Sequence, residues 1–488
     1  MKFFILIFLT QFLFGQFQFD TLSHKKLVDG ASHTKINISS APWMVNVLRF
    51  NFAKSHFSIE TIKAQDKLAG YEKTSSMSAR RNFANHFVVG GVNGDFYGSG
   101  GVPINMQVVN GAPLRMPGPQ SLFGVSENKK LQLSPLAFNS VFIAKNLSIK
   151  INTINAIRQT DFLVLFNNFF GSSTSTNQWG TEIVTQPITK LFLNDTVKLI
   201  VKNKRTGVGN TTIAENEIVF SGHGVAQQFL NSNISIGDTI KIFLGILPAP
   251  KQITQLIGGF PQILKNGINF VADAMIVEGN LSHAYERHPR TALGFSSDST
   301  EIIFVTVDGR QSLSVGMNLN ELASLMINLG AHHAINFDGG GSTTMVAGNT
   351  IVNSPSDAAG ERSVANAIFL ISSLPITSIF DNGKILNDFH LFQNYPNPFN
   401  STTIISYQLS VSSFVTLKVF DVLGKEIATL VNENKEAGKY FVGFDAEKFS
   451  SQKTGGLTSG VYFYRIAIHS DKLTVGDFTE IKKILMIK

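Results

Sequence analysis

The 488-residue sequence contains no cysteine, so neither a disulfide nor a thiol nucleophile can contribute to its fold or chemistry. Charged residues make up only 15% of the chain. Its formal net charge of +7 comes from lysines and arginines that are scattered along the sequence rather than gathered into runs. Basic stretches interleaved with aromatic residues are typical of nucleic-acid-binding proteins, and the sequence contains none. These absences argue against a disulfide scaffold, thiol catalysis and a nucleic-acid partner.

Long apolar runs are also scarce, and the one largely apolar block is Phe3–Phe14. This block follows Lys2 and is too short to span a bilayer. A basic start, a short apolar run and the small residue Gly15 predict a secretory signal peptide over residues 1–16. We therefore expect an exported protein with no membrane span once the signal peptide is removed. A short membrane anchor is the alternative interpretation.

The most informative segment is 336–344, with the sequence Asn-Phe-Asp-Gly-Gly-Gly-Ser-Thr-Thr. Three consecutive glycines suit a place where the backbone comes very close to another group. We expect Asp338 to lie where a strand gives way to a tight loop. Backbone N–H groups and hydroxyls behind it could cradle an anion or a sugar oxygen. The residues of this cradle are Gly339, Gly340, Gly341, Ser342 and Thr343. A strained hairpin is the alternative for this motif taken alone.

The rest of the first 375 residues has mostly strand-like patterns, rich in β-branched and aromatic residues and separated by turn residues. The expected strands include 45–52, 57–64, 87–91, 198–202, 239–244, 291–295, 302–307 and 368–371. Residues 296–300 are polar and predict a hairpin between two of these strands. The fold class expected here is therefore α+β, with a sheet-rich, mixed catalytic domain over residues 17–375.

Helical periodicity is clear over Leu319–Leu329, where apolar residues recur at i, i+3, i+4 and i+7. Asn318 is the expected N-cap, and Glu321 occupies the capping-box position. A second helix is predicted over Ser75–Asn85, with Ala79 and Phe83 turned toward the core. These helices make the predicted domain mixed rather than all-β.

A different pattern follows residues 376–388, which lack apolar periodicity and are expected to form a linker. Residues 389–488 contain short alternating strands at 402–409, 415–420, 438–444 and 460–467, separated by turn residues. About a hundred residues of this kind predict a small all-β sandwich.

Several motifs occur in order around the glycine segment, and together they are far more specific than any one of them. They are Ser75–Arg80, Val92–Tyr97, Ile257–Pro261, His288–Gly294, Val307–Gln311, Gly316–Ala323 and Glu361–Ala367. This series resembles the phosphodiester glycosidase family over most of residues 30–372. The resemblance implies an enzyme that hydrolyses a glycosyl-1-phosphodiester, such as an N-acetylglucosamine-1-phosphodiester, in a glycan.

The C-terminal segment resembles the C-terminal sorting domain of the type IX secretion system. The matching motifs are Tyr395–Asn400, Phe420–Lys425, Ser459–Tyr464 and Lys482–Leu485. The resemblance implies passage through the periplasm and recognition by the secretion translocon. The protein would then be secreted or displayed on the outer-membrane surface. A generic glycan-binding sandwich is the alternative.

A phosphodiester substrate requires a site that holds a phosphate anion, and the guanidinium fork of arginine matches phosphate oxygens. Arg290, Arg310 and Arg362 each lie inside one of the motifs, and we expect at least one to contact the phosphate. The alternative for each is a structural ion pair with Asp308, Asp338 or Glu361.

Asp338 is the first candidate for the catalytic carboxylate, as nucleophile or as general base on water, and Asp95 is the second. His288 could donate a proton near neutral pH, or it could be structural. Asp308 ranks lower because an aspartate before glycine commonly stabilises a turn. Asn93 and Asn336 could donate to sugar hydroxyls or an acetamido group, or could satisfy loop backbone. These last three residues complete the set of candidate ligand contacts.

Several carboxylates near a phosphate would repel it, unless arginines outweigh them or a divalent cation bridges them. A Ca²⁺ or Mg²⁺ site is therefore conceivable, although no ligand spacing in the sequence specifies one. Two other functions remain open at this point. One is a phosphodiesterase that cleaves the P–O bond of a teichoic-acid-like polymer. The other is a non-catalytic surface protein that binds glycans.

Overall fold

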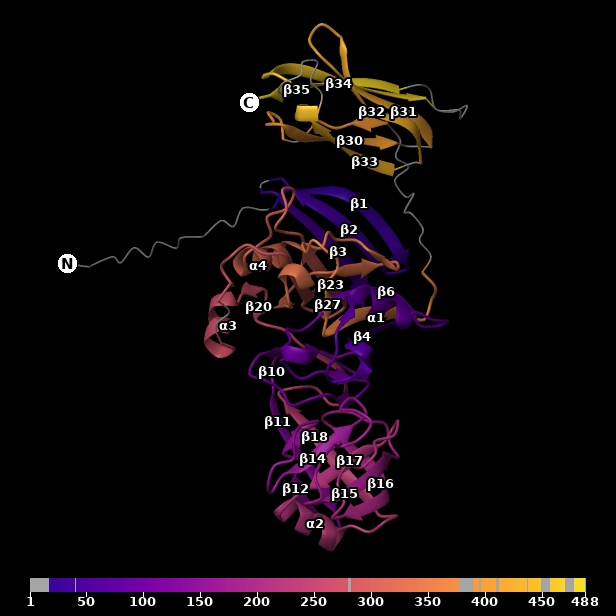
Figure 1. Cartoon of the computed structure of the whole chain (residues 1–488), viewed down its shortest axis with the longest axis vertical. Coiled ribbons are helices and arrows are strands. Elements are labelled where there is room, and N and C mark those ends of the chain that lie inside the picture. Colours follow the sequence, from indigo (N-terminus) through magenta and orange to yellow (C-terminus); the bar gives the residue numbers. More distant parts are fainter. Residues whose placement is uncertain are drawn as a thin grey trace, which may run out of the picture. The chain divides into compact units, whose positions relative to one another are not determined.

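The computed structural model describes residues 17–39, 41–279, 282–376, 389–394, 396–409, 412–436, 438–448, 457–469 and 478–487. The chain divides into two compact units, Met1–Ile379 and Phe380–Lys488 (Figure 1). The predicted signal peptide lies outside the described residues, as does the predicted linker apart from Ile376.

The first unit is organised around an eight-stranded sheet in which all neighbouring strands are antiparallel. Its order is β1 (Phe19–Val28), β2 (Ala31–Ile38), β3 (Trp43–Asn51), β23 (Glu301–Val307), β22 (Arg290–Phe295), β24 (His333–Asn336), β20 (Gln262–Lys265) and β21 (Ile268–Asn269). The polar segment 296–300 joins β22 to β23 as an antiparallel hairpin, which confirms that prediction.

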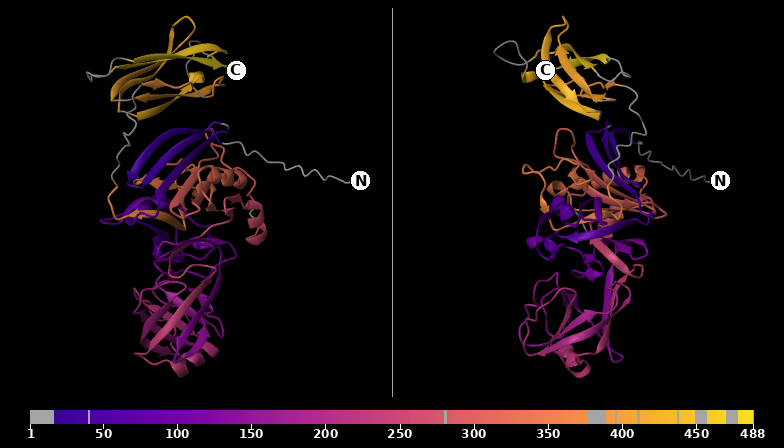
Figure 2. Two further views of the ribbon diagram at one scale, coloured as in Figure 1. Left: turned by 180° about the vertical axis from the view of Figure 1, so that it is seen from behind. Right: turned by 90° about the vertical axis from the view of Figure 1, so that its right-hand side faces the viewer.

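Helices α3 (Val271–Val277) and α4 (Leu319–Asn328) contact this sheet at β20 (Figures 1 and 2). Leu322 and Met326 of α4 are fully buried and pack in one core with Val305 of the sheet. The predicted capping box is confirmed, because Asn318 accepts from the Glu321 N–H at 2.9 Å and Glu321 accepts from the Asn318 N–H at 2.9 Å.

A second, five-stranded sheet shares another core with the first. Its order is β26 (Thr350–Ile351), β25 (Met345–Ala347), β6 (Phe87–Asn93), β28 (Asn366–Ser372) and β4 (Phe57–Lys63). The shared core joins Leu48 and Phe304 of the first sheet to Val92 and Ile368 of the second. The two sheets are therefore held together by apolar packing.

The second predicted helix is shorter than expected. Helix α1 spans Thr74–Arg80, and the chain turns away before Asn85, which has a left-handed φ of 63°. Thr74 and Met77 are fully buried in this helix, whereas Ala79 is exposed and Phe83 is 55% exposed. The expectation that Ala79 and Phe83 face the core was wrong, because Ala79 lies on the solvent side of the helix and the helix ends before Phe83.

The first unit also contains two further large sheets. One has the order β10 (Leu131–Pro135), β9 (Ser121–Ser126), β19 (Ile253–Gly258), β7 (Val108–Val109) and β8 (Ala112–Pro113). The other has the order β12 (Leu147–Lys150), β11 (Ala137–Ala144), β18 (Thr239–Leu247), β16 (Thr196–Thr206), β15 (Thr181–Pro187), β17 (Ile218–Gly222), β14 (Leu163–Asn167) and β13 (Thr153–Ile154). Helix α2 (Val225–Asn233) packs on this last sheet through Ala226 and Leu230.

A two-stranded ribbon links β27 (Ser363–Val364) to β5 (Glu72–Lys73). Its pairs are Ser363 with Lys73 and Val364 with Glu72. The ribbon fixes the segment that leads into α1 against the segment that leads into β28.

The second unit is a small β-sandwich, as predicted. One sheet contains β29 (His390–Leu391), β30 (Thr402–Leu409) and β33 (Gly438–Asp445), and the other contains β32 (Glu426–Lys435), β31 (Ser413–Phe420), β34 (Gly460–His469) and β35 (Phe478–Met486). Burial alternates along β31, where Val415, Leu417 and Val419 are fully buried, as expected for a strand with one face on the core.

Across the described residues the protein is sheet-rich, with four α-helices of seven to ten residues. The expectation of a sheet-rich domain followed by a β-sandwich is confirmed, whereas the α+β label is not. None of the helices in the described ranges has the length and apolarity needed to cross a membrane.

Candidate active site

The sequence-predicted site residues gather where strands from both sheets end. In the first sheet, β24 ends at Asn336, β23 ends at Val307 and β22 begins at Arg290. Arg290 pairs with Val307 in the antiparallel ladder, so these strand ends lie at the same end of the sheet. In the second sheet, β6 ends at Asn93 next to the start of β28. The loops that follow these ends carry the candidate residues.

Asp338 is tied by its backbone to the loop that follows β6. Its N–H donates to the Gly94 carbonyl at 3.0 Å, and its own carbonyl accepts from the Asn93 side-chain amide at 2.7 Å. Burial raises the pKa of the Asp338 carboxyl to about 6, although the Ser342 hydroxyl, the Gly339 N–H and the charge of Arg362 all act in the opposite direction. The carboxyl is therefore desolvated but surrounded by groups that favour its charged form.

Asp95 is the second carboxyl at this place and is 2% exposed. Both of its oxygens accept from Asn105, one from the backbone N–H at 2.9 Å and one from the side-chain amide at 3.0 Å. Burial raises the pKa of Asp95 to about 7, and the nearby Asp338 carboxylate raises it further. The charge of Asp338 thus adds to burial in disfavouring the ionised form of Asp95.

The triple glycine is required by the close approach of other groups. A Cβ on Gly339 would lie 2.7 Å from the Pro289 carbonyl oxygen, and the φ of Gly340 is +61°. A Cβ on Gly341 would clash with the side-chain ends of Asp357 and Arg362. The prediction that the backbone closely approaches other groups here is borne out by this geometry.

Arg362 forms a bidentate ion pair with Asp357, with Nε and Nη2 at 2.8 Å and 3.0 Å from the two carboxylate oxygens. This pairing raises the pKa of Arg362, and Asp338 contributes in the same direction. Glu361, the partner considered from the sequence, instead accepts from the Ser75 N–H at 2.8 Å at the start of α1. Sequence reasoning did not identify Asp357, which no motif marks.

Arg310 is exposed and lies beside the glycine loop. Its guanidinium would be 3.1 Å from a Cβ on Gly340, and its Nη2 is 3.3 Å from Nδ1 of His288. The other ring nitrogen of His288 lies 3.0 Å from the Glu286 carboxylate. Both nitrogens of His288 therefore have protein partners, and the ring orients Arg310.

Arg290 is almost fully buried, at 1% exposure. Its guanidinium donates to the backbone carbonyls of Met317 at 2.8 Å, His283 at 2.9 Å and Glu286 at 2.8 Å. Burial lowers the pKa of Arg290 to about 10, with a further contribution from Arg310. These contacts hold the loop that carries His288, and they occupy donors that were expected to face a phosphate.

Asp308, Asn93 and Asn336 are also buried. The Asp308 carboxylate accepts from the Ser354 N–H at 2.9 Å, and burial raises its pKa to about 6. The Asn336 amide donates to the Phe260 carbonyl at 2.6 Å. Asn93 and Asn336 thus contact backbone groups, as in the structural alternative considered for them, whereas the Asp308 carboxylate binds a distant segment rather than its own turn.

Tyr97 is a site residue that sequence reasoning missed, although it lies two positions after Asp95 within a quoted motif. Its hydroxyl is 3.4 Å from the Ser342 hydroxyl, beside Asp338. The Thr343 hydroxyl is buried and has no hydrogen-bond partner among the described residues. The groups brought together around Asp338 are therefore Asp95, Tyr97, Arg310, Arg362, Ser342 and the glycine loop.

Within the described ranges, no three His, Cys, Asp or Glu side chains are arranged to hold a metal ion together. A Ca²⁺ or Mg²⁺ ion would have to rely on backbone carbonyls or substrate oxygens for most of its ligands. The divalent cation stays a prediction.

Comparison with known proteins gives two domain matches. Residues 196–371 match the family model of phosphodiester glycosidases, and residues 393–476 match that of the secretion system C-terminal sorting domain. The first match includes Asp338 and the three arginines but begins after Asp95.

The chain is 37% identical over 82 residues to the SPbeta prophage-derived uncharacterized protein YomE of Bacillus subtilis, which covers 17% of this chain and 12% of that protein. It is 29% identical over 120 residues to N-acetylglucosamine-1-phosphodiester alpha-N-acetylglucosaminidase of Bos taurus, which covers 23% of this chain and 22% of that enzyme. The aligned segments thus span less than a quarter of either relative.

A solved structure of a hypothetical protein from Synechocystis has a similar fold, with a TM-score of 0.53 at 16% identity. The similarity covers 73% of this chain and 64% of that one. At this identity the likeness concerns the fold alone.

The protein thus carries a phosphodiester glycosidase domain and is distantly homologous to N-acetylglucosamine-1-phosphodiester alpha-N-acetylglucosaminidases. Its C-terminal domain is a type IX secretion sorting domain, which indicates a secreted or cell-surface protein.

Two glycine substitutions test how the loop is held. Gly339→Ala places a methyl group against a fixed carbonyl, so we expect the free energy of unfolding to fall by about 1–3 kcal/mol. For Gly341→Ala the nearest atoms are the flexible ends of Asp357 and Arg362, so it should cost less because these side chains can move. The free energy of unfolding of both variants is measured by urea denaturation.

Gly98→Ala is the matched control, because a Cβ there meets nothing within 4 Å. It should unfold like the wild type. Equal losses for Gly339→Ala and Gly98→Ala would show that the loop does not press against Pro289.

Proposed function

We propose that residues 17–375 form a hydrolase that cleaves a glycosyl-1-phosphodiester in a glycan, of the N-acetylglucosamine-1-phosphodiester kind. Residues 389–488 would then form the domain recognised by the secretion translocon. The observation that carries the proposal is the setting of Asp338. Its carboxyl is desolvated and lies against a glycine loop flanked by Arg310 and Arg362, within the segment that matches the glycosidase family.

Phosphate binding is assigned to Arg310 and Arg362. Arg310 is exposed, and the contact that orients it, with His288, leaves the rest of its guanidinium fork for a ligand. Arg362 is 43% exposed and is fixed by Asp357, so its charge is positioned before substrate arrives. A guanidinium held in place loses less conformational freedom when it binds phosphate.

Asp338 is assigned the chemical step at the sugar C1. Phosphate is a good leaving group, so the C1–O bond can break with the departing monoester carrying the electron pair and negative charge. Asp338 then either attacks C1 itself or takes a proton from the water that does so. Both roles require the ionised carboxylate, which stabilises the positive charge that develops on the sugar ring.

Asp95 is assigned as the partner acid of Asp338. Because two close carboxylates resist ionising together, a protonated Asp95 allows Asp338 to carry the charge. Asn105 donates to both oxygens of Asp95, which fixes the position of the Asp95 carboxyl relative to Asp338. His288 and Arg290 are positioning residues in this scheme, since they orient Arg310 and the loop beside it.

The proposal is tested by incubating the full chain with N-acetylglucosamine-α-1-phosphate esterified to a methyl hexoside. We expect free N-acetylglucosamine from the wild type and a loss of about 10²–10⁴-fold in kcat for Asp338→Asn. Arg310→Ala should lower kcat/KM by about 10–100-fold, because a charge-assisted hydrogen bond is lost.

Arg205→Ala on β16 serves as a control, because its guanidinium contacts the Thr211 hydroxyl and not the site. It should retain wild-type kinetics. Release of sugar at the same rate by the wild type and Asp338→Asn would contradict the assignment of Asp338.

The pH dependence provides a separate test. Asp338 must lose its proton, so kcat/KM should fall below about pH 6, and Asp95 must keep its proton, so kcat/KM should also fall above about pH 7. Asp95→Asn should remove the alkaline limb and leave the acid limb in place, because Asp95 is already neutral where Asp338 titrates. Asp298→Asn, an exposed aspartate in the β22–β23 hairpin, should leave the profile unchanged.

An unaltered alkaline limb in Asp95→Asn would exclude Asp95 as the partner acid. Both raised pKa values also mean that the folded state binds more protons than the unfolded state between about pH 4 and pH 7. Burying these two acids therefore costs stability as the pH rises through that range.

A further inference from the structure

Tyr71 and Tyr97 form an aromatic pair beside Asp338. Their ring centroids are 5.6 Å apart and their planes meet at 74°. The Tyr97 hydroxyl lies 3.4 Å from the Ser342 hydroxyl, and that hydroxyl contacts the Asp338 carboxyl. Tyr71 is 43% exposed, so the pair extends outward from the carboxylate to solvent.

An exposed aromatic pair next to a desolvated acid suits a sugar ring. One face of a pyranose presents C–H groups with partial positive charge, and these are attracted to the electron-rich face of an aromatic ring. Hydroxyls at the rim of the sugar can meet polar groups such as the Tyr97 and Ser342 hydroxyls. The pair therefore offers both kinds of contact that a carbohydrate makes.

The position of Tyr71 is fixed on both sides along the chain. The preceding residue, Gly70, donates its N–H to the Gly100 carbonyl at 2.7 Å. The Gly70 carbonyl accepts from the amine of Lys63, a residue with no exposed surface, at 3.1 Å. The Tyr71 carbonyl accepts from the Gln65 side chain at 3.3 Å.

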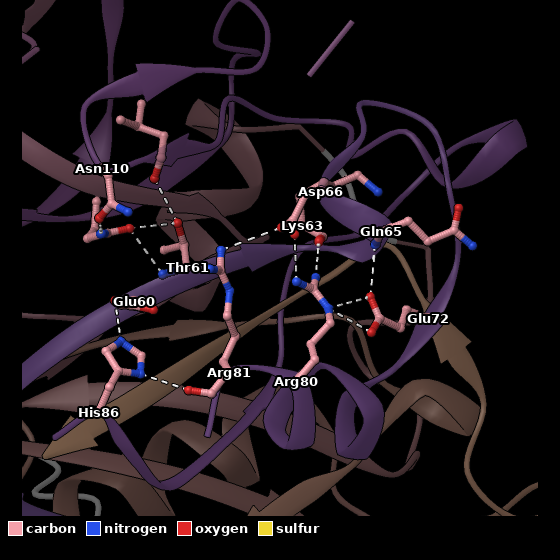
Figure 3. Close-up of polar contacts among 12 residues, drawn as sticks. Glu60, Thr61, Lys63, Gln65, Asp66, Glu72, Arg80, Arg81, His86 and Asn110 are labelled. Atoms are coloured by element: carbon pink, nitrogen blue, oxygen red, sulfur yellow. Dashed lines mark hydrogen bonds and ion pairs between the residues drawn. The ribbon is translucent and has the colours of Figure 1, made fainter. Parts of the chain in front are cut away.

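An ionic cluster clamps the remaining part of this segment onto α1 (Figure 3). Arg80 donates to Glu72 at 2.8 Å and 3.1 Å, to Asp66 at 2.7 Å and to the Lys63 carbonyl at 2.8 Å. Glu72 also accepts from the Gln65 N–H at 2.8 Å. A single guanidinium thus joins three points of segment 63–72.

The backbone of this segment would not adopt its shape from local preference alone. Gln65 and Asp66 are consecutive non-glycine residues with left-handed φ values of 56° and 50°. Such residues cost free energy and persist where surrounding contacts determine them. The contacts of Arg80, Glu72 and Lys63 supply that restraint, and its consequence is a fixed Tyr71.

We propose that Tyr71 and Tyr97 form a subsite for the sugar on the far side of the phosphate from C1, and that Arg80 holds this subsite in shape. The assignment rests on the proposed function of Asp338. A Cβ on Gly341 would clash with Nη2 of Arg362, and the hydroxyl of the next residue, Ser342, is 3.4 Å from the Tyr97 hydroxyl, so a phosphate at Arg362 lies near the pair. Tyr71 is one ring farther out and is therefore reached by the sugar beyond that phosphate.

The test compares two substrates with the full chain. Both contain N-acetylglucosamine-α-1-phosphate, esterified in one case to a methyl hexoside and in the other to methanol. Tyr71→Ala should raise KM about three- to tenfold for the hexoside diester, because one stacking contact is lost, and should leave KM for the methyl diester unchanged. Tyr71→Phe, which keeps the ring, should remain within about twofold of the wild type for both.

Arg80→Gln should raise KM for the hexoside diester in the same direction as Tyr71→Ala, since it removes the clamp without touching substrate. Trp179→Ala is the control, because Trp179 is an exposed aromatic residue at 63% exposure in a different sheet region, just before β15. Its kinetics should match the wild type. A wild-type unfolding midpoint for Tyr71→Ala confirms that the variant folds.

Equal KM values for wild type and Tyr71→Ala on the hexoside diester would overturn the subsite. So would equal increases on both substrates, which would place the contact on the C1 sugar or on the loop as a whole.

If the wild type hydrolyses neither substrate, the proposed function fails. Binding of the hexoside diester then tests separately whether Tyr71 and Tyr97 form a sugar subsite. Saturation-transfer NMR of the wild type with the hexoside diester should then show transfer from aromatic protons to the hexoside ring, and Tyr71→Ala should lose it. Absence of transfer in the wild type would overturn the subsite as well.

Discussion

The side chain of Asn93 is the contact on which the candidate site most depends. It is fully buried, donates to the Asp338 carbonyl at 2.7 Å, and accepts from the Thr291 hydroxyl at 2.8 Å and the Thr344 N–H at 3.1 Å. Asn93 ends β6 of the second sheet, whereas Thr291 lies in β22 of the first. One amide therefore joins both sheets to the two ends of the glycine loop. Any shift of one sheet against the other would move Asp338.

Around this anchor, the charged side chains differ in exposure. Arg290 is buried and donates to backbone carbonyls, so it supports the loops without pairing with a carboxylate. Asp95 and Asp338 are also largely removed from solvent, and burial raises the pKa of each. Arg310 and Arg362 lie at the surface, where an anion can reach them. In the proposed function, the two exposed arginines bind the phosphate, and the charge of Asp338 disfavours ionisation of Asp95.

The sequence was sufficient for features set by local chemistry. The capping box of α4, the β22–β23 hairpin, the C-terminal sandwich and the tight loop after Asp338 all follow from residue type and spacing. The capping box and the hairpin depend on contacts within a few residues, and the sandwich depends on the alternation of apolar residues. The glycine loop was recognisable because three consecutive glycines are hard to explain unless another group approaches closely.

The roles of individual charged residues could not be read in the same way, because they depend on which loops meet in space. Arg290 and Arg310 look alike in sequence, yet one is buried and the other exposed. Arg362 pairs with Asp357, whereas its neighbour Glu361 turns away to α1. Tyr71 gave no signal, since its place beside Tyr97 comes from an ionic cluster and two left-handed residues. Phe83 was misplaced because the helix ends early.

The central claim is that the bond broken lies between the sugar C1 and oxygen, and hydrolysis in ¹⁸O-labelled water tests it most directly. With N-acetylglucosamine-α-1-phosphate esterified to a methyl hexoside, the account predicts the label in the released N-acetylglucosamine and none in the phosphate. Label in the phosphate would contradict it and identify a phosphodiesterase acting at the P–O bond. No hydrolysis of this or related sugar phosphodiesters would instead leave a surface protein that binds glycans without cleaving them.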